Sequence, residues 1–154
     1  MSGLRIVVGC DNAGFDYKEV LRADLAAHPL VEAVTDLGVY AEALKAASYG
    51  DIGLRAGEEI TAGRADRAVL VCGTGIGMSI AANKVPGVRA TVAHDAFSVE
   101  RSILSNDCQV LTLGQRVIGL ELTRRLVREW ITYRFDPASA SAAKVDVISA
   151  YESR

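Results

Sequence analysis

Several features that mark particular classes of protein are scarce or missing in this 154-residue chain. It has no run of basic residues and carries a formal net charge of -2, which argues against a nucleic-acid-binding surface. No apolar stretch approaches the length that crosses a bilayer, and the first strand-like run begins too early to leave room for a signal peptide. Two histidines are too few for a histidine metal cluster. We therefore expect no nucleic-acid partner, no membrane association and no bound metal.

The three cysteines exclude two further kinds of structure, a disulfide framework and a zinc site. Cys10, Cys72 and Cys108 are odd in number and unrelated in spacing, so they form neither a disulfide framework nor a zinc motif. Free thiols are typical of a reducing compartment, and we expect a cytoplasmic protein. Half of the residues are hydrophobic, enough for one proper core, and no repeat or linker divides the chain. Residues 1–154 are expected to form a single domain.

Apolar runs rich in Val, Ile and Leu alternate with amphipathic segments along the whole chain. This alternation predicts an α/β fold, a single Rossmann-like doubly wound domain with a five-stranded parallel sheet and a C-terminal helix. The predicted strands lie at 4–10, 31–37, 68–72, 88–93 and 108–113. The predicted helices lie at about 14–27, 51–62, 78–84, 98–104, 120–133 and 139–151, and residues 38–49 are expected to form a loop.

The most informative segment is 69–84, VLVCGTGIGMSIAANK, which reads as a buried strand, a glycine turn and a helix. Gly73, Gly75 and Gly77 follow Cys72 at alternate positions, and such a turn presents backbone N–H groups to an anion. A thiolate beside these donors could take a proton from carbon while the donors hold the oxygens of an enediolate. Taken alone, the segment is equally compatible with a small buried cysteine before an ordinary turn.

In a doubly wound fold, ligands lie beyond the carboxyl ends of the strands. Asp11 and Asn12 follow the first predicted strand, His94 follows the fourth, and Arg116 follows the fifth, so all are expected beside the glycine turn. Three of these residues have a structural alternative: Asp11 could cap a helix, Arg116 could pair with a surface carboxylate, and His94 could be a hydrogen-bonding residue at a helix start.

Six short motifs carry a resemblance to a known family. They are 9–14 (GCDNAG), 72–77 (CGTGIG), 81–84 (AANK), 86–90 (PGVRA), 105–107 (SND) and 114–121 (GQRVIGLE). In this order they span nearly the whole chain, which resembles the ribose-5-phosphate isomerase B / galactose-6-phosphate isomerase (LacA/LacB) family. The resemblance implies a cofactor-independent aldose–ketose isomerase acting on a small phosphorylated sugar. It also implies a homodimer or a dimer of dimers with active sites at the interface.

The resemblance assigns roles to individual residues. Cys72 would be the base that moves a proton between C1 and C2, and Thr74 would assist proton transfer at the oxygens. Gly73, Gly75 and Gly77 would supply the anion hole. Asp11 and Asn106 would bind sugar hydroxyls, and Arg116 would contribute to phosphate binding.

The chain also departs from the family pattern at informative positions. Asn12 and Ser105 stand where ribose-5-phosphate isomerases of this type usually carry histidines, which are associated with opening the furanose ring. Neither an amide nor a hydroxyl suits that acid–base task. Of the family's C-terminal phosphate-binding arginine pair, only Lys144 plausibly matches a position, and Arg134 or Lys144 could compensate for the loss.

A substrate that never closes into a ring would explain the missing histidines. In a tetrose 4-phosphate the C4 oxygen is esterified, so no five-membered hemiacetal forms. We therefore expect interconversion of D-erythrulose 4-phosphate and D-erythrose 4-phosphate, as in erythritol-type polyol catabolism. One alternative keeps ribose 5-phosphate as the substrate, with His94 opening the ring; another makes the chain a non-catalytic sugar-phosphate binding subunit.

The predicted helix 120–133 offers a broad apolar face, made by Leu122, Leu126, Val127 and Trp130. Such a face fits a subunit interface, and it fits packing on the chain's own sheet equally well.

Overall fold

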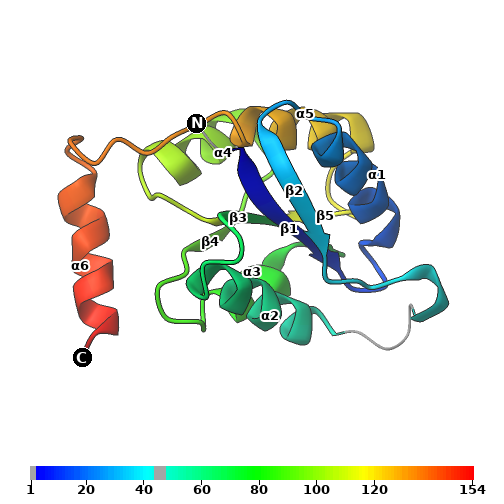
Figure 1. Ribbon diagram of the computed structural model, residues 1–154, viewed down its shortest axis with the longest axis horizontal. Coiled ribbons are helices and arrows are strands. Elements are labelled where there is room, and N and C mark those ends of the chain that lie inside the picture. Colours follow the sequence, from blue (N-terminus) through cyan, green and yellow to red (C-terminus); the bar gives the residue numbers. More distant parts are fainter. Residues whose placement is uncertain (1–2, 44–47) are drawn as a thin grey trace.

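The structure, a computed structural model, describes residues 3–43 and 48–154. Five parallel strands form one sheet in the order β2-β1-β3-β5-β4, which confirms the predicted α/β class and the parallel sheet (Figure 1). The strands are β1 (Leu4–Cys10), β2 (Val31–Asp36), β3 (Arg67–Cys72), β4 (Ala90–Val92) and β5 (Val110–Gly114). The helices are α1 (Phe15–Ala26), α2 (Tyr49–Thr61), α3 (Ile76–Ala82), α4 (Ala96–Leu104), α5 (Leu120–Trp130) and α6 (Ala142–Glu152).

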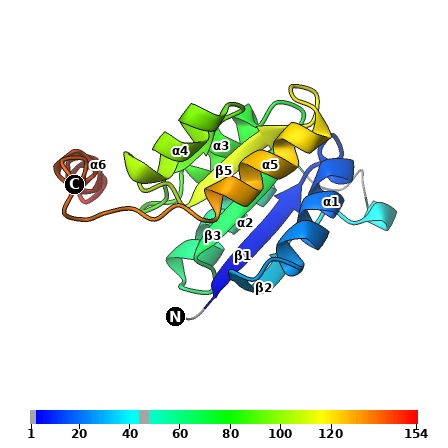
Figure 2. The ribbon, with the colours of Figure 1, turned by 90° about the horizontal axis from the view of Figure 1, so that it is seen from above.

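Helices cover both faces of the sheet. Helices α1, α4 and α5 pack on one face, and α2 and α3 pack on the other (Figures 1 and 2). Every residue of β3 and β5 is buried, as expected for parallel strands enclosed on two sides. The sheet is therefore the rigid middle layer from which the loops at its carboxyl edge project.

Most predicted boundaries differ from the structure by one to three residues, and two of these differences have a clear physical cause. The strand predicted at 88–93 is reduced to the three residues of β4, because a turn at Gly87, with a φ of 88°, delays its start. The predicted loop 38–49 contains a 3₁₀ turn at Ala41–Ala43, and α2 begins within it at Tyr49, since the Ser48 hydroxyl accepts a hydrogen bond from Asp51 N and caps the helix. Residues 44–47 lie outside the described residues.

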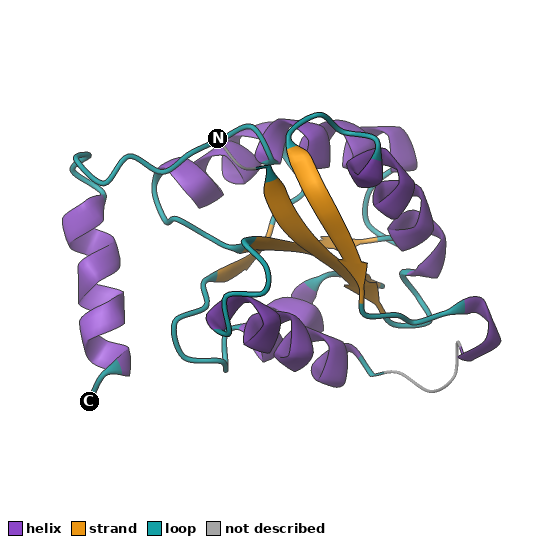
Figure 3. Cartoon of the chain, viewed as in Figure 1, coloured by secondary structure: helices purple, strands orange, loops and turns teal. Residues whose placement is uncertain are grey.

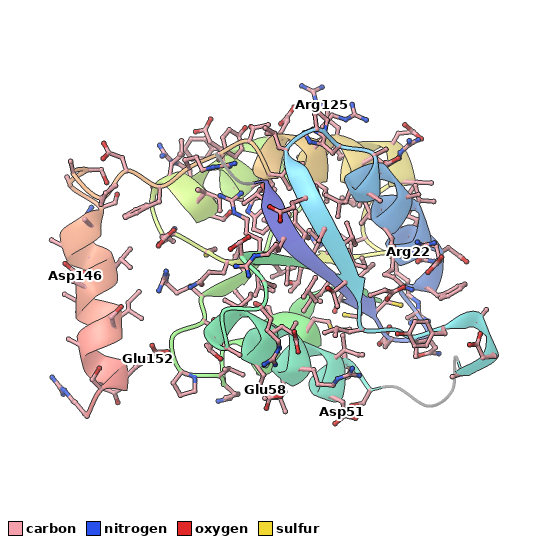
Figure 4. The ribbon with its side chains drawn as sticks, viewed as in Figure 1. Arg22, Asp51, Glu58, Arg125, Asp146 and Glu152 are labelled. Atoms are coloured by element: carbon pink, nitrogen blue, oxygen red, sulfur yellow. The ribbon has the colours of Figure 1, made fainter. Side chains whose placement is uncertain are left out.

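Helix α5 packs on its own sheet. Leu126, Val127 and Trp130 are buried in the core, and Leu122 is exposed. The apolar face of α5 therefore serves mainly to pack on the chain's own sheet, which is one of the two predicted alternatives. Of its four apolar residues, only Leu122 is available to a partner. On the outer side Arg125 pairs with Glu129, and Figure 4 shows Arg125 pointing away from the sheet.

The last helix, α6, stands apart from the body of the chain at the end of an extended segment (Figures 1 and 3). Of its residues only Val145 is buried, while Val147, Ile148 and Tyr151 are exposed. Glu152 faces the body, and its carboxylate accepts a hydrogen bond from Gly87 N (Figure 4). No helix in the described residues is long and apolar enough to cross a membrane.

Candidate active site

The carboxyl ends of β1 and β3 meet in the middle of the sheet, where the chain turns from one side of the sheet to the other. This is the point at which doubly wound folds bind ligands. A pocket of about 650 Å³ opens here. It is lined by Asp11, Asn12, Ala13, Tyr49, Cys72, Gly73, Thr74, Ile76, Gly77, Ile80 and Arg116. The structure thus brings together seven of the predicted residues, which are Asp11, Asn12, Cys72, Gly73, Thr74, Gly77 and Arg116.

The centre of the pocket is Cys72, the last residue of β3. Its side chain is buried, and its Sγ accepts a hydrogen bond from Gly75 N at 3.0 Å. This hydrogen bond fixes the sulfur beside the glycine turn. Thr74, between them, is exposed, and its hydroxyl accepts a hydrogen bond from Ile76 N at 3.3 Å. The turn therefore holds a thiol, a hydroxyl and backbone donors within a few residues.

The conformation of this turn requires glycine at position 75. Gly75 has a φ of 82°, and a Cβ there would lie 2.9 Å from Val92 Cγ2 and 3.0 Å from Leu113 N. The Thr112 hydroxyl holds the turn from below by donating to Gly75 O at 2.8 Å. Strands β4 and β5 thus fix the donors before any ligand arrives, as electrostatic catalysis needs.

The other two thiols differ from Cys72. Cys10 and Cys108 are buried, and burial raises the pKa of each to about 11. Both groups are therefore protonated at neutral pH and poor bases. Cys72 is the thiol that lines the pocket.

Asp11 does not cap helix α1. The residue before α1 is Gly14, whereas the Asp11 carboxylate accepts a hydrogen bond from Ala13 N at 2.9 Å within the preceding turn. Asp11 is largely buried at the pocket wall and Asn12 is exposed beside it. The turn thus directs one carboxylate and one amide to the cavity.

Backbone hydrogen bonds fix the position of Arg116, and its side chain lines the pocket. Its N–H donates to Gly73 O at 3.1 Å, and the preceding Gln115 N donates to Cys72 O at 2.9 Å. The side chain passes over Gly73, whose missing Cβ would lie 3.5 Å from Arg116 Nη1. Within residues 3–43 and 48–154 no carboxylate pairs with Arg116, so the alternative of a surface ion pair is not observed. A cation in this position suits a phosphate.

Three predicted residues lie elsewhere in the single chain. Ser105 ends helix α4, Asn106 lines a separate cleft of about 850 Å³ between α4 and α6, and Lys144 is exposed on α6. None of them lines the Cys72 pocket. The single chain therefore does not bring these residues to Cys72, and their predicted roles stay predictions.

His94 also lies outside the lining of the Cys72 pocket. Its Nε2 accepts a hydrogen bond from Gly114 N at 2.8 Å, the kind of contact that its structural alternative predicts. Burial lowers the pKa of His94 below its ordinary value, and the carboxylate of Asp95 offsets part of this effect.

The sequence interpretation missed the apolar wall of the pocket, formed by Tyr49, Ile76 and Ile80. All three side chains are more than half exposed. The Tyr49 ring lies over Gly77, where a Cβ would come within 2.5 Å of it. The available signal was Ser48, a favoured helix cap, which would have placed Tyr49 at the start of a helix pointing to the site.

Comparison with known proteins identifies the architecture. The family model described as Ribose/Galactose Isomerase matches residues 6–148. The chain belongs to this family. D-erythrulose-4-phosphate isomerase 2 of Mycolicibacterium smegmatis is 57% identical over 149 residues, covering 97% of each chain. D-erythrulose-4-phosphate isomerase of Pectobacterium atrosepticum is 40% identical over 97% of this chain and 95% of its own.

Among solved structures, ribose-5-phosphate isomerase B of Clostridium thermocellum superposes with a TM-score of 0.90 at 35% identity, covering 97% of this chain and 98% of the other. The expected membership in this family is confirmed, and the protein is a sugar-phosphate aldose–ketose isomerase. Moving a hydrogen between two carbons needs a base, and holding a phosphorylated sugar needs a group that binds anions. The Cys72 pocket contains groups suited to each task. No cluster of three or more His, Cys, Asp or Glu side chains able to hold a metal occurs in the described part of the chain.

Proposed function

We propose that this isomerase interconverts D-erythrulose 4-phosphate and D-erythrose 4-phosphate through an enediolate. The observation that carries the proposal is the make-up of the Cys72 pocket, which offers a base and anion donors but, among the described residues that line it, no imidazole. Asn12 stands beside Asp11 where a ring-opening histidine would be needed for a furanose. A four-carbon 4-phosphate has no furanose to open. The 57% identity to a D-erythrulose-4-phosphate isomerase supports the same substrate.

In the proposed reaction the Cys72 thiolate removes a proton from C1 of the ketose. The electron pair of the broken C–H bond forms a C1–C2 double bond, and the C2 carbonyl becomes an enediolate oxygen held by N–H groups of the Gly73–Gly77 turn. The proton on sulfur then returns to C2, and the proton on O1 passes to O2 with help from the Thr74 hydroxyl. The products are an aldehyde at C1, a hydroxyl at C2 and the thiolate again. Asp11 binds a sugar hydroxyl and Arg116 binds the phosphate.

The proposed active unit is a homodimer, or a dimer of dimers, acting in the cytoplasm. Asn106 and Lys144 lie away from the Cys72 pocket of their own chain, and α6 extends from the body with Val147, Ile148 and Tyr151 exposed. An arm of this kind is suited to lie on a second copy, which would bring Asn106 and Lys144 to a neighbouring pocket. Three free thiols fit a reducing compartment.

A mixing experiment tests the shared site. Cys72→Ala and Asn106→Ala chains are each expected to be inactive alone. Hybrids formed by unfolding and refolding them together should regain up to about a quarter of the wild-type activity, because a quarter of the sites would contain both native residues. Mixtures that stay inactive, with hybrids demonstrated by mass spectrometry, contradict a shared site.

Ribose 5-phosphate remains the second candidate substrate, supported by the likeness to ribose-5-phosphate isomerase B at 35% identity. It requires His94 to open the ring. In this structure the Nε2 of His94 is engaged by Gly114 N, which leaves Nδ1 for any proton transfer. A His94→Gln protein that loses ribose 5-phosphate turnover but keeps erythrulose 4-phosphate turnover would favour this candidate.

The role of Cys72 is tested by proton exchange. Incubating the protein with D-erythrulose 4-phosphate in D2O should place deuterium at C1, detected by NMR. Cys72→Ala should lose exchange by about a thousandfold or more while still binding the sugar phosphate, because the remaining groups bind but do not move the proton. Cys108→Ala is the matched control, since that thiol lines the other cleft. Exchange that survives in Cys72→Ala rejects the thiol as the base.

A further inference from the structure

The pair formed by His94 and Gly114 continues the sheet beyond the end of β4. Strand β4 runs beside β5, with Val92 opposite Thr112, and Ala93 N still donates to Thr112 O at 3.4 Å. In a continued parallel ladder the carbonyl of Ala93 would accept the next hydrogen bond, from Gly114 N. Here the imidazole of His94 accepts it instead, at 2.8 Å. A side chain thus replaces a backbone rung at the edge of the active site.

Gly114 is connected to the catalytic turn on two sides. A Cβ on Gly114 would lie 2.7 Å from the backbone of Thr74, so the two backbones are in direct contact. Gly114 is also the residue from which the chain turns into Gln115 and Arg116, whose N–H groups bond Cys72 O and Gly73 O. Any movement of Gly114 therefore moves both the anion donors and the arginine that faces the pocket.

We propose that His94 is a positioning residue, which in its neutral form fixes Gly114 and thereby aligns Arg116 and the Thr74 turn for binding of the phosphorylated substrate. Protonation gives Nε2 a hydrogen and removes its lone pair, so an imidazolium cannot accept from Gly114 N. We call the hydrogen bond from Gly114 N to His94 Nε2 the clamp. The substrate class rests on the function proposed above, whereas the clamp is a property of the free protein.

The surroundings of His94 favour the neutral form. Asp95 is the adjacent charge on its own segment, and its carboxylate accepts from Ser98 N at the start of α4. The facing strand β5 contributes Thr112, Leu113 and Gly114, which carry no charge, and α3 is also free of charged residues. Among the described residues, Asp95 is the charge that acts on the pKa of His94, and burial outweighs its effect.

The sign of the pH effect follows from the depressed pKa of His94. The unfolded chain takes up the proton first as pH falls below about 6.5, so the folded state loses stability at acidic pH and the clamp opens when the folded protein is protonated. Substrate affinity should fall in the same range. The phosphate of the substrate also titrates, near pH 6, but this affects every variant equally.

Two substitutions separate the hydrogen bond from its titration. His94→Gln places an amide oxygen near the position of Nε2 and accepts from Gly114 N without titrating. His94→Ala removes the acceptor. We expect KM at about pH 7.5 to be near the wild-type value in His94→Gln and about tenfold higher in His94→Ala, with kcat changed less in each, since about one net hydrogen bond is lost. At about pH 5 the wild-type KM should rise relative to His94→Gln and approach that of His94→Ala.

Amide hydrogen exchange at Gly114 in the free protein supplies a readout independent of turnover. It should be about tenfold faster in His94→Ala than in the wild type at neutral pH, and close to the wild type in His94→Gln. Equal exchange in all three proteins overturns the clamp, whatever the substrate. If exchange at Gly114 follows the expected pattern but KM does not rise in His94→Ala, the role of the clamp in substrate binding is overturned. The same holds if KM rises equally at acidic pH in His94→Gln and in the wild type. If no sugar phosphate tested is turned over, the proposed function fails and the exchange result still decides the clamp.

Discussion

Replacing Gly75 by alanine tests the catalytic turn at its tightest point. Gly75 combines a φ of 82° with a confined position, where a Cβ would lie 2.9 Å from Val92 Cγ2 and 3.0 Å from Leu113 N. Its N–H donates to Cys72 Sγ at 3.0 Å. The substitution therefore strains the backbone and displaces a donor at the same time.

The expected magnitude comes from these two effects. A left-handed alanine costs about 1–2 kcal/mol, and a crowded methyl group adds about 1–3 kcal/mol, so we expect a loss of about 2–5 kcal/mol of unfolding free energy. Displacing one oxyanion donor lowers kcat by about 100-fold or more.

Gly63→Ala provides the matched control. Gly63 has a φ of 70° but no neighbour within 4 Å of a Cβ, and it lies outside the pocket lining. It should lose only about 1–2 kcal/mol and keep its full kcat. Urea unfolding and steady-state assays of both proteins provide the comparison. A Gly75→Ala protein with kcat within about threefold of the wild type would refute the argument that this turn preorganises the donors.

Three further substitutions test the support of the fold and the apolar wall. Arg67→Met should cost about 2–3 kcal/mol by urea unfolding, because the buried guanidinium donates to Trp130 O and to a second carbonyl, whereas Arg64→Met at an exposed ion pair should barely change stability. Lys18→Met should cost about 3 kcal/mol in the same measurement, since the buried ammonium is the partner of two carboxylates; an unchanged midpoint would contradict this. Tyr49→Ala should raise KM about tenfold with little change in kcat, as expected for loss of binding surface shared by ground and transition states; a selective fall of kcat would argue for a chemical role.

The fold could be predicted because its strands carry their own signal. Strands β1, β3 and β5 are continuous apolar runs that parallel sheets bury on both faces. The order of the last two strands could not be predicted, because β4 has only three half-buried residues and no feature that marks it as an edge. The start of α2 was missed because Tyr49 and Gly50 lack the helical apolar spacing, while the decisive signal was the Ser48 cap.

The site residues that could be predicted from the sequence are those at the carboxyl ends of strands. Asp11, Cys72 and Arg116 each lie at the end of a strand or within two residues of it, and parallel strands bring such positions to one edge. Asn106 and Lys144 could not be placed this way, because neither follows a strand: Asn106 comes after α4 and Lys144 lies on α6. The hydrogen bond of His94 was also beyond sequence reasoning, since it depends on where β4 ends.

A thiol pocket without a ring-opening imidazole is suited to an open-chain sugar phosphate. The most direct test compares kcat/KM of the purified protein for D-erythrulose 4-phosphate and D-ribose 5-phosphate in the same buffer. We expect the tetrulose phosphate to be preferred by about 100-fold or more, the scale of a missing general acid–base group. Equal or greater kcat/KM for ribose 5-phosphate would contradict it and show that another group of this protein opens the ring.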